Sequence, residues 1–159
     1  ILELRLSGDF AGKRVLFVGY GEQAEMLNEK INDLDLSDCC YYLGPKTHRE
    51  LSELYNQADI MIFPTMLYES LGLVGIEAMA CGCPVIGSDI GCLPEYIKEG
   101  ITGFLFEPGN SHELAERIVD FYKLTEKQRN TMRLEAIRYV DKYESRKISQ
   151  ALINKIKEI

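Results

Sequence analysis

Two glutamates, Glu69 and Glu77, stand eight positions apart in the stretch YESLGLVGIEAMACG. Carboxylates accept paired hydrogen bonds from vicinal hydroxyls, such as those of a sugar or a ribose. The residues between them are apolar and glycine-rich, and we expect a helix from about Leu71 to Cys81. Eight residues of helix would span about 12 Å. The spacing therefore indicates one elongated ligand that touches both carboxylates.

The start of this predicted helix suits an anionic group. The first N–H groups of a helix have no partner within it, and the helix dipole adds partial positive charge there. Gly72 has no Cβ, so a ligand can approach the backbone closely. Phosphate oxygens bind at such positions without a basic side chain. Our hypothesis places a sugar ring at Glu69, a diphosphate over the helix start and a ribose at Glu77.

A purely structural role for the two glutamates stays open as the alternative. Glu69 near a helix N-terminus would stabilise the helix by about 0.3–1 kcal/mol through the dipole. Glu77 would then be an exposed helix residue. However, Ile76, Ala78 and Met79 surround it with apolar side chains. That composition predicts a helix without a polar face, which is buried, and a carboxylate that needs a partner.

The chain alternates short apolar runs with segments of helical periodicity. This order predicts βαβ units and an α/β fold, with a Rossmann-like parallel sheet flanked by helices. We expect the strand at 14–19 to be fully buried because it is apolar and β-branched. Thr47 and Ser111 are the expected N-caps of two helices. Further strands are expected at 39–44, 59–64, 84–88 and just before Pro108.

Residues 1–142 are expected to form one Rossmann-like domain, followed by a C-terminal helix at 143–159. The sequence begins ILELRLSGDF, without Met and without the profile of a signal peptide. We therefore interpret the chain as an N-terminally truncated fragment of a larger protein.

A second glycine motif follows the first predicted strand. Gly19, Gly21 and Ala24 form G-x-G-x-x-A, which matches a dinucleotide-binding fingerprint in form. That fingerprint expects an acidic residue at the end of the next strand, whereas this strand runs into LGPK. The glycines more simply allow a tight turn between strand and helix, so NAD or FAD is disfavoured. The turn still lies at the carboxyl edge of the sheet, where ligands bind.

Composition excludes several other classes. The net charge of −7 and pI near 4.9 argue against nucleic-acid binding. No run of about 18 apolar residues is present, so we expect no membrane span. The five cysteines are an odd number and include one adjacent pair, which argues against a disulfide framework and for a reducing compartment. Cys81 and Cys83 lack the spacing and partners of a structural zinc site, so we expect no metal.

The stretch FPTMLYESLGLVGIEAMACGCPVIGSDIGCLPEYIKEGITGFLFEPGN carries a resemblance to a known family. It resembles the C-terminal, donor-binding domain of group 1 retaining glycosyltransferases with the GT-B fold. Glu69 and Glu77 match the E-x7-E motif of that family, and the similarity covers most of residues 14–124.

The resemblance implies a role for each motif residue. Glu69 would contact the transferred sugar and serve as the catalytic residue, and Glu77 would bind the ribose hydroxyls. The backbone amides after Glu69 would bind the diphosphate, a loop after the second strand would meet the base, and the first glycine loop would face the cleft. These three groups are Ser70, Leu71, Gly72 and Leu73; then Gly44, Pro45 and Lys46; then Gly19 and Gly21.

The same resemblance implies a partner domain and a reaction. A nucleotide-diphosphate sugar would be the donor, a glycan or lipid-linked molecule the acceptor, and no metal would be required. We expect the acceptor-binding N-terminal domain and the usual Arg and Lys pair to lie outside this fragment, since only thirteen residues precede Arg14. We therefore expect the fragment not to catalyse alone. The full protein is expected in the cytoplasm, and peripheral membrane association through the missing domain stays open.

Two other functional classes stay open beside sugar transfer. One is an epimerase acting on nucleotide sugars, which also has two such domains, although the E-x7-E block argues against it. The other is a binding module for nucleotides that keeps the fold without the chemistry.

Overall fold

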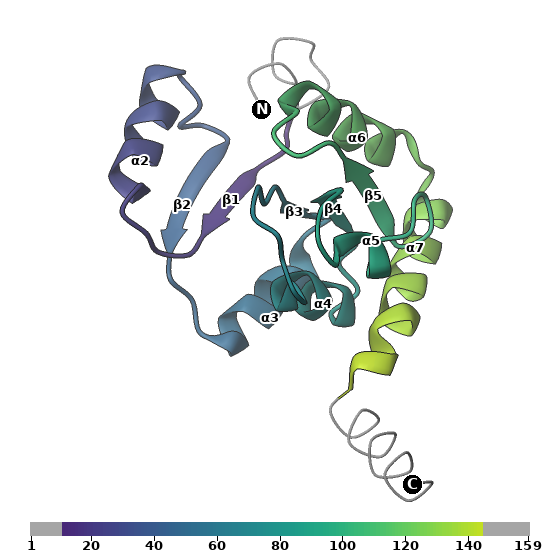
Figure 1. Ribbon diagram of the computed structural model, residues 1–159. Helices are drawn as coiled ribbons and strands as arrows, with labels where there is room; N and C mark the ends of the chain where they lie inside the picture. The colour runs from purple at the N-terminus through teal and green to yellow at the C-terminus, as the bar shows by residue number, and fades with distance from the viewer. Residues whose placement is uncertain (1–10, 145–159) are drawn as a thin grey trace, which may run out of the picture. The chain divides into compact units, whose positions relative to one another are not determined.

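The computed structural model describes residues 11–144 and divides the chain into two compact units, Ile1–Glu53 and Leu54–Ile159 (Figure 1). Each unit is described by itself. The helix predicted at 143–159 lies outside the described residues, apart from its first two positions. The last described element is a short 3-10 helix, η1, at Asp141–Tyr143.

The first unit contains two parallel strands joined by a helix. β1 (Val15–Val18) pairs with β2 (Cys40–Gly44), and α2 (Ala24–Asp33) connects them. Its buried residues include Ile31 of α2 and Leu36 in the following turn. This βαβ arrangement confirms the predicted parallel pairing of the first two strands.

The prediction that the first strand is fully buried is wrong. Along β1 the side chains alternate between partly buried and exposed, with Leu16 44% exposed and Val18 38% exposed. Successive side chains of a strand point to opposite faces. The helix α2, which connects β1 to β2, covers one face of this two-stranded sheet. The β1 side chains on the other face therefore remain exposed. The β-branched run predicted the strand correctly but could not predict which faces are covered.

The second unit is built on three parallel strands in the order β3-β4-β5. The central strand β4 is buried at all four positions, as expected for a strand with a neighbour on each side. The elements of this unit are β3 (Met61–Phe63), α4 (Leu73–Ala80), β4 (Val85–Ser88), α5 (Leu93–Tyr96), β5 (Gly103–Phe106), α6 (Ser111–Lys123) and α7 (Glu126–Val140).

Helices cover both faces of this sheet (Figure 1). Val85 of β4 packs in one apolar cluster with α4, α5 and α7, to which Met79, Tyr96 and Ala136 belong. On the other side, α6 contacts β4 and β5 and buries Phe121. The cluster under α4 matters for function because it holds the helix that begins just after Glu69.

Helix α3 (His48–Gln57) begins as the sequence predicts. The Thr47 amide donates to the Glu50 carboxylate at 2.8 Å, and the Glu50 amide donates to the Thr47 hydroxyl at 3.3 Å. These reciprocal bonds are the capping box that the spacing of Thr47 and Glu50 indicated.

Helix α6 is capped one residue earlier than predicted. The Asn110 side chain accepts a hydrogen bond from the Glu113 amide at 3.0 Å, whereas Ser111 is already the first helical residue. The expectation that Ser111 is the cap is therefore wrong. Asn and Ser are both good N-cap residues, so the sequence alone could not show which of the two neighbours caps the helix. The turn after Pro108 places Asn110 at the non-helical position.

This assignment predicts different costs for two adjacent substitutions. Asn110→Ala should lower the free energy of unfolding by about 1 kcal/mol because it leaves a helix N–H without its acceptor. Ser111→Ala, the matched control, should change it by less than about 0.5 kcal/mol. Urea denaturation of both variants measures the difference, and an equal loss in the two would contradict the Asn110 cap.

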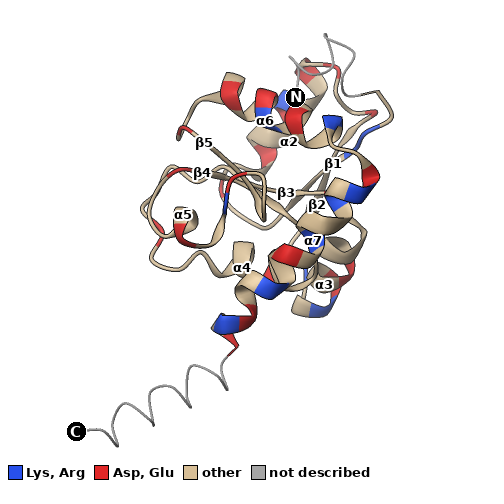
Figure 2. Ribbon diagram, turned by 90° about the vertical axis from the view of Figure 1, so that its right-hand side faces the viewer, with Lys and Arg blue, Asp and Glu red and all other residues tan. Residues whose placement is uncertain are grey.

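The charged residues are unevenly distributed among the helices of the described part of the chain. Figure 2 shows α6 and α7 carrying both acidic and basic residues, whereas α4 contains Glu77 as its only charged residue. Between residues 11 and 144 there is no helix with the length and apolar character needed to cross a membrane.

Candidate functional site

Glu69 lies in the loop between β3 and α4, at the carboxyl end of β3. Its side chain is partly buried, and the Thr65 hydroxyl is 3.4 Å from the carboxylate oxygen Oε1. Its backbone carbonyl accepts a hydrogen bond from the Cys92 amide at 3.0 Å. A loop from the next strand thus fixes the Glu69 backbone, while the carboxylate keeps contact with solvent.

Gly91 packs directly onto the backbone of Glu69. A Cβ added at Gly91 would lie 2.5 Å from the Glu69 carbonyl oxygen and 2.7 Å from its nitrogen, distances that real Cβ atoms do not adopt. Gly91 also has a φ of +60°, which side-chain-bearing residues rarely adopt. Only glycine therefore allows this approach, and the loop after β4 sets the position of Glu69.

Helix α4 begins at Leu73, two residues later than the sequence suggested. Gly72 precedes it with φ 61° and ψ 51°, a left-handed conformation, and its carbonyl accepts from the Gly75 amide at 2.9 Å. Ser70 and Leu71 lie in the exposed bend before this turn. The amides of the first helical turn are consequently those of Leu73 and the residues after it.

The outer face of α4 brings Glu77 into line with the helix start. Gly75, Ile76, Ala78 and Met79 are buried, whereas Leu73 is 59% exposed and Val74 is exposed as well. Glu77 is partly buried and stands four residues after Leu73, on the same face and one turn along. The carboxylate thus shares its face with the exposed first turn.

Two expectations about this helix need correction. Residues 69–72 are not helical, so the separation of Glu69 and Glu77 is not a length of about 12 Å along one helix. Within the helix, Glu77 stands four positions after Leu73, which corresponds to a rise of about 6 Å. Nor is α4 buried all round, because the glycine-based turn at Gly72 leaves its first turn on the surface. Composition could not reveal this one-sided exposure.

The charge of the Glu77 carboxylate affects the hydroxyl of Tyr55. Burial raises the pKa of the Tyr55 hydroxyl, and the Glu77 carboxylate raises it further. The phenol therefore stays protonated at neutral pH beside the carboxylate. Sequence analysis did not connect these two residues, which stand on different helices.

Tyr96 supports the start of α4 from below. It is fully buried, and its hydroxyl donates to the Gly72 carbonyl at 3.2 Å. Burial, with smaller contributions from Cys92 and Glu69, raises the pKa of the Tyr96 hydroxyl well above its usual value. The hydroxyl therefore remains a hydrogen-bond donor at physiological pH.

The glycine loops of the first unit meet within that unit. The Gly19 amide donates to the Gly44 carbonyl at 3.1 Å, and the Tyr42 hydroxyl donates to the Gly19 carbonyl at 2.9 Å. Gly21 and Pro45 are exposed. The Lys46 ammonium donates to the Leu43 carbonyl at 2.9 Å, within its own loop. The predicted contacts of these residues with a base or a cleft stay predictions.

The structure therefore brings together the predicted residues of the second unit. The Glu69 loop, the first turn of α4 and Glu77 lie on one continuous segment, which is held by Gly91 in the loop after β4 and by Tyr96 at the end of α5. Sequence reasoning missed both of these supporting residues. The available signal for Tyr96 was a tyrosine between the apolar residues Leu93 and Ile97, because a buried phenol needs a hydrogen-bond partner.

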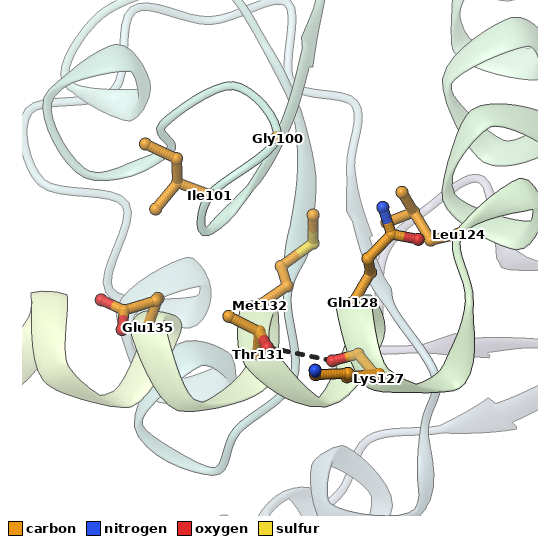
Figure 3. Close-up of a pocket in the computed structure, with 8 residues that line it drawn as sticks. All are labelled: Gly100, Ile101, Leu124, Lys127, Gln128, Thr131, Met132 and Glu135. Atoms are coloured by element: carbon orange, nitrogen blue, oxygen red, sulfur yellow. Dashed lines mark hydrogen bonds between the residues drawn. The ribbon is translucent and has the colours of Figure 1, made fainter.

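A separate hollow of about 470 Å³ lies beside α7 (Figure 3). Gly100 and Ile101 line one side, and Lys127, Met132 and Glu135 of α7 line the other. It lies by the loop that leads into β5, whereas Glu69 follows the carboxyl end of β3. Ligands of parallel sheets bind at the carboxyl ends of the strands, so this hollow is not the candidate site.

The cysteines and acidic residues of the described part do not assemble a metal site. In residues 11–144, no group of three or more His, Cys, Asp or Glu side chains could hold an ion. All five cysteines are free thiols. Cys39 and Cys40 are buried with their sulfurs 3.9 Å apart, and burial raises the pKa of Cys40 to about 11.

A family model described as glycosyl transferases group 1 matches residues 9–138. The chain belongs to the group 1 glycosyltransferases. The E-x7-E motif of Glu69 and Glu77 lies inside the matched range, as do all the other predicted site residues.

Curated relatives agree with this group 1 glycosyltransferase assignment. The chain is 35% identical over 117 residues to N-acetyl-alpha-D-glucosaminyl L-malate synthase of Bacillus anthracis, covering 74% of this chain and 30% of that protein. It is 34% identical over 122 residues to D-inositol 3-phosphate glycosyltransferase of Mycobacteroides abscessus, covering 74% and 27%. The chain thus spans under a third of the length of these relatives.

Solved glycosyltransferase structures share the fold. Anabaena HepE in complex with UDP is 26% identical, with a TM-score of 0.82, and the match covers 92% of this chain and 41% of that one. Sucrose-phosphate synthase from Thermosynechococcus elongatus is also 26% identical, with a TM-score of 0.81 and coverage of 97% and 41%. The fold class predicted from the sequence is confirmed by these GT-B neighbours.

The packing of Gly91 against Glu69 predicts a costly substitution in this glycosyltransferase domain. Gly91→Ala should lower the free energy of unfolding by about 1–2 kcal/mol through its positive φ. A further loss of about 1–3 kcal/mol should follow because the methyl group meets the Glu69 backbone.

Gly100→Ala is the matched control, because Gly100 has a φ of +69° but no atom near its added Cβ. Urea denaturation of the two variants separates the strain of the backbone from the contact with Glu69. Equal losses in the two variants would show that the contact contributes nothing.

Proposed function

We propose that the second unit binds the diphosphate and sugar of a nucleotide-sugar donor, and that the full protein transfers this sugar to an acceptor. The observation that carries the proposal is the E-x7-E segment of a group 1 glycosyltransferase with its helix start exposed. Glu69 stands before the first turn of α4 and Glu77 one turn inside it, on the exposed face. In this reading, the ligand runs along that face.

The diphosphate is assigned to the start of α4. The amides of Leu73 and Val74 open the helix at the positive end of its dipole, whereas the Gly75 amide already donates to the Gly72 carbonyl. Ser70 and Leu71 form the exposed bend before it, whereas Gly72 is buried. Anions bind at helix starts of this kind. A Cβ at Gly72 would point toward Tyr96 and Phe63 in the core, so the expectation that its absence admits the ligand is wrong. The ligand would instead reach the first turn from the exposed side of Leu73.

The two carboxylates are given different tasks. Glu77 would accept hydrogen bonds from the ribose hydroxyls, because carboxylate oxygens pair well with a vicinal diol. Glu69 would hold the transferred sugar and orient it for transfer. Its backbone is fixed by Gly91 and Cys92, so the side chain extends from a fixed point before the helix start. Orientation of this kind contributes to catalysis without covalent attack.

The chemical step is the departure of a nucleoside diphosphate. Preorganised N–H donors at the start of α4 would stabilise the charge that develops on the leaving oxygen. We propose that this replaces a metal ion and that the sugar keeps its anomeric configuration. A glycan or lipid-linked acceptor would be held by a further domain, and closure of that domain would exclude water. The UDP in the structure of HepE, one of the similar proteins, supports this proposal.

Removing the Glu77 carboxylate should weaken nucleotide binding through the ribose. Glu77→Ala should raise the Kd of UDP, or of GDP or ADP if these bind better, by about tenfold to a hundredfold. The loss should disappear for the 2′,3′-dideoxy nucleotide, which offers no hydroxyls. Isothermal calorimetry measures both, and Glu116→Ala on the exposed surface of α6 serves as the control. An equal loss with both nucleotides would overturn the ribose assignment.

Removing the Glu69 carboxylate should affect the sugar and not the nucleotide. Glu69→Ala should bind UDP within about twofold of the wild type but lose about tenfold of the added affinity for the UDP-sugar. Equal losses for the two ligands would contradict this division of roles.

Turnover distinguishes sugar transfer from the other two classes. At its full length, the protein should transfer sugar from donor to acceptor in the presence of EDTA, with retention seen by NMR of the anomeric proton. A donor converted to its epimer without transfer would favour the epimerase. Binding without any conversion would favour the nucleotide-binding module.

A further inference from the structure

We propose that Tyr96 is a positioning residue that aims the Leu73 amide at the diphosphate of the donor. The inference rests on the proposed function and deepens it, because it names what orients the helix start. Tyr96 does not itself contact the ligand in this proposal. It acts through the Gly72 carbonyl, to which its hydroxyl donates at 3.2 Å.

The peptide between Gly72 and Leu73 transmits this effect. A trans peptide is planar, and its C=O and N–H point in opposite directions. When the hydroxyl of a buried tyrosine holds the Gly72 carbonyl inward, the Leu73 N–H points away from the core. That amide is among the first of α4 and has no partner within the helix. The tyrosine hydroxyl, together with the Gly75 amide that donates to the same carbonyl at 2.9 Å, therefore fixes the direction of one of the proposed phosphate donors.

The fit around the hydroxyl leaves little freedom. A Cβ added at Gly72 would lie 2.7 Å from the Tyr96 oxygen, and one added at Gly75 would lie 2.6 Å from it. Phe63 and Leu93 also close on Gly72, at 3.1 and 3.3 Å from the same added Cβ. The Tyr96 hydroxyl thus packs against the start of α4 at two glycines, Gly72 and Gly75. A small displacement of the ring would move the turn.

The same short helix also reaches Glu69. Cys92 precedes α5 and donates its amide to the Glu69 carbonyl, and Tyr96 ends α5 and donates to Gly72. The segment 92–96 therefore fixes both the carboxylate proposed for the sugar and the turn proposed for the diphosphate. Within this segment, Cys92 holds the part of the donor site at Glu69 and Tyr96 holds the part at the helix start.

Tyr96→Phe removes the hydroxyl and keeps the ring that fills the core. UDP should bind the 159-residue wild-type chain with a shift of the Leu73 amide resonance, which NMR titration detects even for weak binding. In Tyr96→Phe that shift should shrink, and the Kd of UDP should rise by about threefold to tenfold. The Kd of uridine should stay within about twofold, because uridine has no phosphate.

The control is Tyr41→Phe. The Tyr41 hydroxyl also donates to a backbone carbonyl, that of Asp38, at 2.8 Å. This variant loses a tyrosine-to-carbonyl hydrogen bond that involves neither α4 nor the segment 92–96, so it should bind UDP as the wild type does.

A second variant tests the same contact without altering the tyrosine. Gly75→Ala places a methyl group where the hydroxyl stands, while alanine favours the helix. It should also weaken UDP binding and leave uridine binding unchanged. It keeps the test decisive if Tyr96→Phe proves unable to fold.

Each result has one meaning. Selective loss of UDP binding in either variant supports the positioning role. Equal losses for UDP and uridine, or unchanged UDP binding, would overturn it and leave Tyr96 a residue of the core. If neither UDP, GDP nor ADP shifts the Leu73 amide of the wild type, the proposed donor site itself fails, and this inference fails with it.

Discussion

The close contact of the loop after β4 with the backbone of Glu69 is the constraint on which the proposed site depends. Gly91 leaves no space for a Cβ beside Glu69, and the Cys92 amide holds its carbonyl. Two loops that follow adjacent parallel strands are thereby joined at the carboxyl edge of the sheet. The distance between these two loops is therefore constrained, because no side chain stands between them that could change its rotamer.

The second support lies in the core beneath α4. Tyr96 belongs to the apolar cluster that also contains Met79 of α4 and Ala136 of α7, so it is held on several sides. Its hydroxyl is the polar atom that reaches from this core to the helix start. The first turn of α4 is therefore held in place by contacts on its buried side. Its exposed side, which would meet a ligand, takes no part in this packing.

Much of the fold followed from the sequence, because apolar runs and helical periods report local structure directly. The five strands, the capping box at Thr47 and the parallel pairing were all predicted. Errors arose where two neighbouring residues could do the same task, as with Asn110 and Ser111, or where burial depended on elements far along the chain, as with Leu16. Burial is a property of the assembled layers, and a single strand does not contain it.

For the site, sequence alone determined which residues have the required chemistry and in what order they come. Glu69, the glycine-containing turn and Glu77 are contiguous, so their identity as one motif needs no tertiary information. Only the tertiary structure decided that α4 begins at Leu73, that Glu77 shares its exposed face, and that Gly91 and Tyr96 hold the segment in place. The physical reason is that these contacts join residues about twenty positions apart. Only the parallel pairing of β3 with β4 brings the loops that follow these strands together.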